Sequence, residues 1–156
     1  MIKLKPLAKM TAYVESVTST GRMAMGARQL YVVKDGTVEG ERINGVILAG
    51  GGDNLLVDPE GRGHVDARVT WKTNDGAIIY VQYYGRVIMN DQVGAAFKTG
   101  AGTAFGDTHF VTQPRFETGD PRYAWLNNVV AVAEGRVAEG RAIQYNIYSC
   151  DVESGG

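Results

Sequence analysis

The sequence predicts an all-β fold, an antiparallel β-barrel of about eight strands with one short helix at most. Two observations predict it. Segments rich in β-branched and aromatic residues recur along the chain and are separated by short turns. Glycine contributes 21 of the 156 residues and proline only 4, which indicates many turns and little helix. A closed barrel is favoured over a sandwich because it leaves no exposed edge, and a barrel of this size can hold one small ligand.

The first three strands are expected at residues 7–17, 27–33 and 38–48. Asp35-Gly36, between the second and third of these, is a dipeptide typical of hairpin turns. Gly40 and Gly45 interrupt the third segment, which indicates a bulge or a bend there.

The remaining strands are expected at residues 64–73, 77–88, 108–113, 125–133 and 137–151. An Asn-Asp-Gly turn at 74–76 joins the first two of these into a hairpin, and a Glu-Gly-Arg turn at 134–136 joins the last two. Pro114 ends the short strand before it. Helical signals are weak, and the best candidate is the segment 91–98, with Asp91 as its N-cap.

The length predicts a single β-barrel domain over residues 1–156. Lys and Arg total 16 and Asp and Glu total 17, so the chain lacks the basic surface of a nucleic-acid-binding protein. No segment approaches the roughly 18 apolar residues of a membrane-spanning helix, and the first residues carry no apolar signal core. We therefore expect a cytoplasmic protein whose partner is a small organic molecule, with neither membrane nor nucleic acid, and the sequence leaves a homo-oligomer open.

The residues that usually bind metals or perform covalent catalysis are scarce. His64, His109 and Cys150 are too few for a zinc site, so no metal is expected. The single cysteine cannot form an internal disulfide, which fits a reducing compartment, and we expect it to be neither catalytic nor a ligand. The chain also lacks a nucleophile elbow, a phosphate loop and a dinucleotide fingerprint. An enzyme with this sequence is therefore expected to use acid–base chemistry without a cofactor.

The expected strand at 64–73 separates its residues onto two faces. Val65, Ala67, Val69, Trp71 and Thr73 share one face, and His64, Asp66, Arg68, Thr70 and Lys72 share the other. The polar face is either the wet outside of an antiparallel sheet or the lining of a polar barrel mouth, with Asp66 and Arg68 pointing inward. The sequence leaves both alternatives open.

Two further segments combine glycines with charged residues. Three glycines at 50–52 form a tight crossing between strands or hold Asp53 at a pocket rim, where its carboxylate can transfer a proton. Arg28 either binds a carboxylate or an anionic substrate through its forked donors or forms a surface ion pair. Residues 94–106 contain four glycines and are expected to be a mobile flap over an opening or simply disordered.

Aromatic and polar side chains alternate between residues 116 and 127. Phe116 and Trp125, with Glu117 and Asn127 beside them, suit recognition of a flat organic ligand. The alternative is that the two aromatic side chains fill the core.

Several of these segments together resemble the family catalogued as domain of unknown function 3237, also described as uncharacterised protein family 0311. The residues that carry the resemblance are Gly-Ala-Arg at 26–28, the glycine-bounded segment 36–45, Gly-Gly-Gly-Asp at 50–53, Asp-Ala-Arg at 66–68, Thr-Asn-Asp-Gly at 73–76, Phe-Glu-Thr-Gly at 116–119 and Tyr-Ala-Trp-Leu-Asn at 123–127. The resemblance covers about residues 7–148 and implies a compact antiparallel barrel, similar in outline to lipocalin and allene oxide cyclase barrels. In the family's pattern a tryptophan follows the aspartate, whereas this chain has Asn54.

We consider two functions for such a barrel. The first is a cofactor-independent isomerase, cyclase or lyase acting on a small aromatic or polyketide-like molecule, with Asp53 as general acid or base and Asp66 as its carboxylate counterpart. In that enzyme Arg28 and Arg68 bind a substrate oxygen, Phe116 and Trp125 form an apolar wall, and Glu117 and Asn127 supply polar contacts. The second is a carrier or sensor that binds such a ligand without reacting. Outward-facing Asp66 and Arg68 would weaken the enzyme hypothesis.

Overall fold

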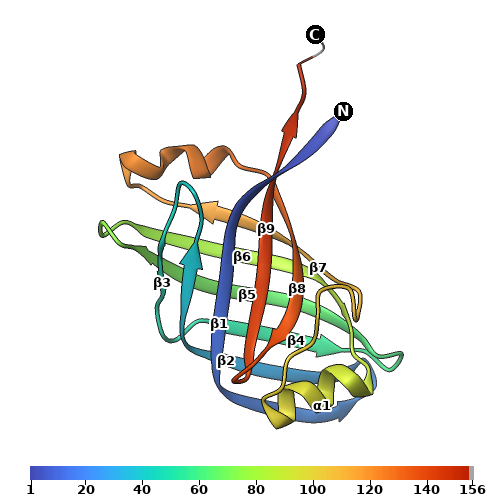
Figure 1. The fold of residues 1–156 in the computed structure, drawn as a ribbon. Helices are drawn as coiled ribbons and strands as arrows, with labels where there is room; N and C mark the ends of the chain where they lie inside the picture. Colours follow the sequence, from blue (N-terminus) through green and yellow to red (C-terminus); the bar gives the residue numbers. More distant parts are fainter. Residues whose placement is uncertain (155–156) are drawn as a thin grey trace.

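Nine antiparallel strands close into a barrel of eight strand positions in residues 1–154, the part of the chain that the computed structural model describes (Figure 1). The strands are β1 (Ile2–Met23), β2 (Gly26–Glu39), β3 (Gly45–Ile47), β4 (Gly52–Val57), β5 (Arg62–Thr73), β6 (Ile78–Ile88), β7 (Phe110–Glu117), β8 (Ala131–Ala138) and β9 (Ala142–Val152). Their order around the barrel is β1-β9-β8-β7-β6-β5, followed by β3 and β4, which share the position between β5 and β2. Pairing of β2 with β1 closes the ring, so the predicted all-β barrel is confirmed.

Strand alternation builds the core from one face of this sheet. Along β5, Val65, Ala67, Val69 and Trp71 are at most 3% exposed, while the residues that alternate with them reach solvent. The polar face of this strand is therefore the outside of the barrel, as the first of the two alternatives states.

The predicted helix and the central hairpin are also confirmed. The helix α1 spans Asp91–Thr99, and its N-cap is Asn90 rather than Asp91, because the Asn90 side chain accepts a hydrogen bond from the Val93 backbone N–H. Strands β5 and β6 are joined around the turn at 74–76 in continuous antiparallel register.

The other two expected turns are wrong, because both lie inside strands. Gly36 continues β2 and pairs with Ala12 of β1 and Ile47 of β3. Gly135 lies within β8, where a Cβ atom would come within 2.8 Å of the Phe110 ring, and the chain turns at 139–141 instead.

Several expected strand boundaries differ from the structure, and β1 and β2 are longer than the expected strands 7–17 and 27–33. The segment 38–48 is not one strand, because residues 40–44 form a loop between β2 and β3. Strand β7 continues through Pro114 to Glu117, and the sequence did not predict β4. Trp125 lies not in a strand but in η1, a 3₁₀ segment at Pro121–Asn128.

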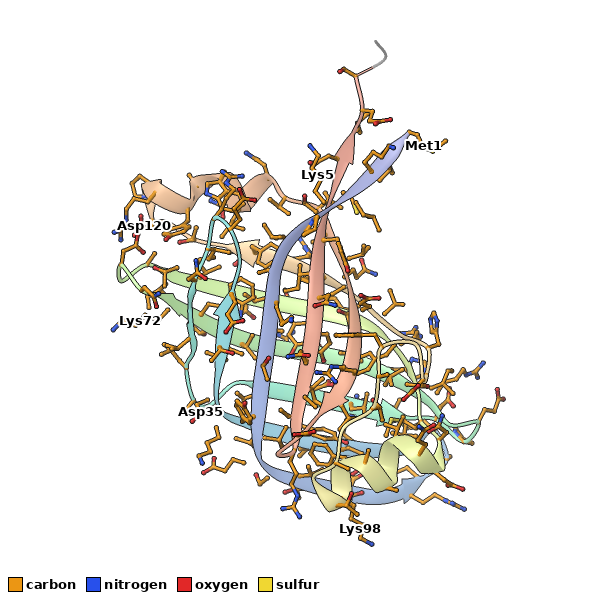
Figure 2. The ribbon with its side chains drawn as sticks, viewed as in Figure 1. Met1, Lys5, Asp35, Lys72, Lys98 and Asp120 are labelled. Atoms are coloured by element: carbon orange, nitrogen blue, oxygen red, sulfur yellow. The ribbon has the colours of Figure 1, made fainter. Side chains whose placement is uncertain are left out.

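The two helical segments lie at opposite ends of the barrel (Figure 1). Asp120, which caps η1, and Lys98, in α1, mark these two ends in Figure 2. Leu126 of η1 is fully buried and belongs to the same core cluster as Trp71 and Phe116, so the η1 end is filled by side chains. Neither helical segment within residues 1–154 has the length and apolar character needed to cross a bilayer.

Candidate active site

A cavity of about 200 Å³ lies inside the barrel at the end covered by α1. Its wall is mostly aliphatic and aromatic, and its polar groups are the carboxyl of Asp53 and the hydroxyls of Tyr31, Tyr83 and Tyr145. An apolar cavity with a few convergent polar groups is the usual form of a small-molecule site.

Strand register sets the polar groups on one side of this cavity in a row. Asp53 of β4 lies directly opposite Tyr31 of β2 and opposite Ala67 of β5, and Ala67 lies opposite Tyr83 of β6. Since directly paired residues point to the same face of a sheet, all four side chains point inward. The small side chain of Ala67 leaves space between the Asp53 carboxyl and the Tyr83 ring.

The glycines before Asp53 allow the strands to cross closely. A Cβ atom at Gly51 would lie 2.5 Å from the Arg68 carbonyl oxygen, so a larger residue would push β4 away from β5. This confirms the expected tight crossing, and the same crossing places the next strand residues so that Asp53 enters the cavity.

Between β4 and β5, the Asp53 carboxyl takes the place of a backbone carbonyl as a hydrogen-bond acceptor. Its Oδ1 accepts a hydrogen bond of 3.0 Å from the Asp66 backbone N–H. Burial raises the pKa of Asp53 to about 6, against the lowering effect of this hydrogen bond. The negative charge of Asp66 raises the pKa further and the positive charge of Arg28 lowers it.

Tyr145 of β9 completes the polar lining from the other side. Its ring packs edge-on against Tyr83 at 5.3 Å and against Phe110 at 5.4 Å, measured between ring centroids. Gly135, which pairs directly with Tyr145, has no side chain and so leaves room for the Phe110 ring.

Arg28, Asp66 and Arg68 do not share this cavity with Asp53. Asp66 and Arg68 form a 3.4 Å ion pair on the outer face of β5, beside the exposed Asn54. The Arg28 Nη1 donates to the Asn54 backbone carbonyl at 2.9 Å, also outside the barrel. The expectation that all four charged residues surround one cavity is wrong, because strand alternation turns three of them to the outer face.

The predicted substrate-binding residues at 116–127 lie at the η1 end, away from the cavity. Phe116 packs against Trp71 with ring centroids 5.5 Å apart, and the Arg42 guanidinium lies 3.7 Å from the centre of the Trp125 ring. These two aromatic residues fill or cover the core, which is the second of the two alternatives.

The two polar residues of this group, Glu117 and Asn127, also lie outside the cavity. The Asn127 side chain accepts from the Thr118 N–H and donates to the Thr118 carbonyl, so it fixes the loop after β7. Glu117 is exposed at the end of β7. Neither residue reaches the cavity that holds Asp53.

A model of the family described as protein of unknown function (DUF3237) matches residues 2–150. The chain belongs to this family. Among its DUF3237 relatives, the UPF0311 protein RPA1785 of Rhodopseudomonas palustris is 33% identical over 125 residues, which cover 80% of this chain and 82% of that protein. The UPF0311 protein CA_C3321 of Clostridium acetobutylicum is 33% identical over 122 residues, which cover 78% and 77%.

Solved structures share the fold of this DUF3237 chain. A beta-barrel like protein from Acinetobacter baumannii AYE superposes with a TM-score of 0.81 at 32% identity, covering 97% of each chain. The RPA1785 crystal structure gives a TM-score of 0.85 at 28% identity over 97% of this chain and 98% of that one. An enzyme from Penicillium herquei, at 18% identity and a TM-score of 0.73, covers 96% and 95% and shows the same fold.

The three tyrosines of this DUF3237 barrel are the site residues that the sequence did not predict. Tyr83 follows Ile79 and Val81 at alternate positions of an expected strand, so this alternation was the signal that could have identified its inward-facing side chain. Tyr31 and Tyr145 lie in strands whose predicted turns were wrong, so their facing could not be worked out.

Two other expectations concern the covering segment and metals. Val93, Gly94 and Phe97 line the cavity, so the start of the 94–106 segment does cover it, as part of α1 rather than as an irregular loop. Within residues 1–154, no three His, Cys, Asp or Glu side chains gather in a way that could hold a metal ion.

Proposed function

We propose that this DUF3237 protein is a cofactor-independent acid–base enzyme, an isomerase, cyclase or lyase, that acts on a small aromatic or polyketide-like molecule in the barrel cavity. One observation carries the proposal: the cavity holds a single carboxyl, Asp53, in an otherwise apolar and hydroxyl-bearing wall. With a pKa of about 6, this carboxyl can be ionised or protonated near neutral pH. Such a group can both accept and return a proton.

The surroundings of Asp53 support a catalytic rather than a structural role. A buried carboxyl that served only the fold would be expected to satisfy both oxygens within the protein. Here Oδ1 accepts the Asp66 N–H, and the side chain borders the cavity. The Penicillium herquei enzyme shares this fold, so the barrel is an architecture on which catalysis occurs.

Proton exchange on a neutral ketone tests this function. 2-Tetralone has an acidic C–H beside its carbonyl and is small enough for the cavity, so incorporation of deuterium from D₂O, followed by NMR, reports proton abstraction directly. We expect the protein to accelerate exchange, with a rate that rises with pH through about 6 because the ionised carboxyl is the base. Asp53→Asn should lose roughly a hundredfold or more.

Asp35→Asn is the matched control for this test. Asp35 is an exposed carboxyl in β2 whose side chain lies on the outside of the barrel (Figure 2). The Asp35→Asn variant should therefore catalyse exchange of 2-tetralone as fast as the unmodified protein does. If Asp53→Asn and the unmodified protein exchange 2-tetralone at equal rates, Asp53 is not the catalytic base.

A carrier or sensor of the same ligand is the second candidate. The observation that favours it is the outward orientation of Asp66, Arg68 and Arg28, which leaves the cavity without a charged pair. Binding of 2-tetralone with no acceleration of exchange would support the carrier and contradict the enzyme.

A further inference from the structure

The three tyrosine hydroxyls are the polar cavity groups to which acid–base chemistry at Asp53 gives no role. Tyr31 and Tyr83 lie in the same register row as Asp53, and Tyr145 faces Tyr83 from the other side of the barrel. The three hydroxyls and the carboxyl therefore converge on one volume of about 200 Å³.

Packing fixes the directions of these rings. The Tyr145 ring is held edge-on between Tyr83 and Phe110, at 5.3 and 5.4 Å. The Tyr31 ring meets Phe97 of α1 edge-on at 5.5 Å. Donors held in this way need no reorganisation when charge develops near them.

All three hydroxyls keep their protons at physiological pH. Burial is the largest effect that raises the pKa of each, and the negative charge of Asp53 raises it further. The hydroxyls of Tyr83 and Tyr145 also interact with each other, which lowers the pKa of Tyr83 and raises that of Tyr145. Each hydroxyl therefore keeps its proton, and none competes with Asp53 as a base.

The cavity provides nothing to neutralise an anionic ligand. Among residues 1–154, no Lys, Arg or His lines it, and Asp53 itself becomes negative above its pKa. A carboxylate or phosphate that entered this cavity would be a buried charge without a partner of opposite sign. The wall instead suits an uncharged molecule with one oxygen that can accept hydrogen bonds.

We propose that the hydroxyls of Tyr83 and Tyr145 bind the carbonyl or phenol oxygen of an uncharged substrate, and that this pair stabilises the charge that forms there during proton transfer. The proposal rests on the proposed function. The Asp53 carboxylate takes a proton from the carbon next to the carbonyl, the C–H electron pair forms the enolate C=C bond, and the carbonyl π pair moves to oxygen. That oxygen accepts the tyrosine hydrogen bonds. The protonated Asp53 then returns the proton to another carbon of the same π system, so atoms and electrons balance without a co-reactant.

Three probes of one shape and different polarity test this recognition. At pH 7, 2-naphthol is uncharged and carries one oxygen, naphthalene has none, and 2-naphthoate is an anion. We expect 2-naphthol to bind the full-length protein at least about tenfold more tightly than either of the other two, measured by calorimetry or by the fluorescence of the probe. Naphthoate binding as tight as naphthol binding would overturn the proposal.

Tyr83→Phe and Tyr145→Phe keep the ring packing and remove one hydroxyl each. Each should weaken 2-naphthol binding about three- to tenfold and leave naphthalene binding unchanged. Tyr84→Phe is the matched control, since Tyr84 is in the same strand but half-exposed on the outer face, where its hydroxyl accepts from Gln82. Equal losses for naphthol and naphthalene, or no loss in either variant, would overturn the proposal.

The oxygen-binding site and the proposed enzyme function can fail independently, and the experiments distinguish the two failures. In the Asp53→Asn background, Tyr83→Phe should still weaken 2-naphthol binding about three- to tenfold, because the oxygen site does not depend on the carboxyl. If 2-naphthol binding depends on the tyrosines but the protein does not catalyse exchange of 2-tetralone, the proposed enzyme function is contradicted and the oxygen-binding site is supported. If the protein catalyses exchange but neither tyrosine variant changes 2-naphthol binding, the oxygen-binding site is contradicted and the enzyme function is not.

Discussion

Asp53 is a residue whose burial opposes the stability of the fold. Its pKa is raised from 3.8 to about 6, so the folded protein holds this proton more tightly than the unfolded chain does. Between these two pH values the folded state binds more protons, and the free energy of unfolding therefore falls as the pH rises. Above pH 6 the free energy of unfolding is therefore roughly 3 kcal/mol lower than it would be if the pKa of Asp53 were unchanged by folding.

Asp53→Asn is therefore expected to stabilise the protein while it abolishes proton transfer. At pH 7.5 its free energy of unfolding should exceed that of the unmodified protein by up to roughly 3 kcal/mol, since the buried charge is gone. Near pH 3.5 the two proteins should be equally stable. Urea unfolding at both pH values measures this, with Asp35→Asn as the control. A gain that is the same at both pH values would contradict a titrating, buried Asp53.

The outward-facing charges next to Asp53 act on its pKa through the barrel wall. Removing the positive charge with Arg28→Gln should raise the pKa of Asp53, and removing the negative charge with Asp66→Asn should lower it. Carbon-13 NMR titration of the Asp53 carboxyl measures both shifts. Shifts in the same direction would show that changes in structure, not charge, dominate.

The sequence predicted Asp53 correctly as a residue at a glycine crossing, but it grouped Asp53 with the wrong neighbours. Residues close in sequence, such as Asp66 and Arg68, have defined spacing along a strand, yet spacing alone does not say which face is inside. Trp125 was misplaced because aromatic composition does not distinguish a strand from the 3₁₀ segment in which it lies.

At the scale of elements, long strands override local turn signals. Asp35-Gly36 would form a hairpin turn in a short segment, but β2 continues through it because it pairs with β1 on one side and β3 on the other. Such long-range pairing is invisible to a dipeptide rule. By contrast, the hairpin at 74–76 was predictable because both of its strands pair with each other along their whole length.

Gly135 shows what a glycine inside a strand contributes here. A Cβ atom at this position would lie 2.8–2.9 Å from the Phe110 ring, which in turn packs on Tyr145. Gly135→Ala should therefore destabilise the protein by about 1–3 kcal/mol and weaken binding of 2-naphthol, because Phe110 must move. Gly119→Ala, where a Cβ atom meets nothing within 4 Å, should change neither. Unaltered stability of Gly135→Ala in urea unfolding would show that β8 can move aside.

On the scale of the whole molecule, the two ends of the barrel differ in how they are closed. The η1 end is filled by core side chains, including Trp71 and Leu126, which are at most 1% exposed. The other end has the cavity and is covered by α1, a helix of 9 residues. Isolated helices of this length are marginally stable, so α1 depends on its packing and its caps. Because Val93, Gly94 and Phe97 of α1 line the cavity, we expect a change in this helix to affect ligand entry.

Loosening α1 should therefore speed ligand entry without loosening the barrel. Asn90→Ala removes the side chain that accepts from the Val93 N–H, a loss of roughly 1 kcal/mol for the helix. Hydrogen exchange of the α1 amides should then accelerate about fivefold, and the association rate of 2-naphthol should rise, while the amides of β5 and β6 stay as protected as before. Asp120→Ala removes the corresponding cap of η1, where Asp120 accepts from the Arg122 N–H, and should leave the association rate unchanged. If Asn90→Ala raises exchange equally in α1 and in the barrel strands, the helix is part of one cooperative unit and not a separate cover.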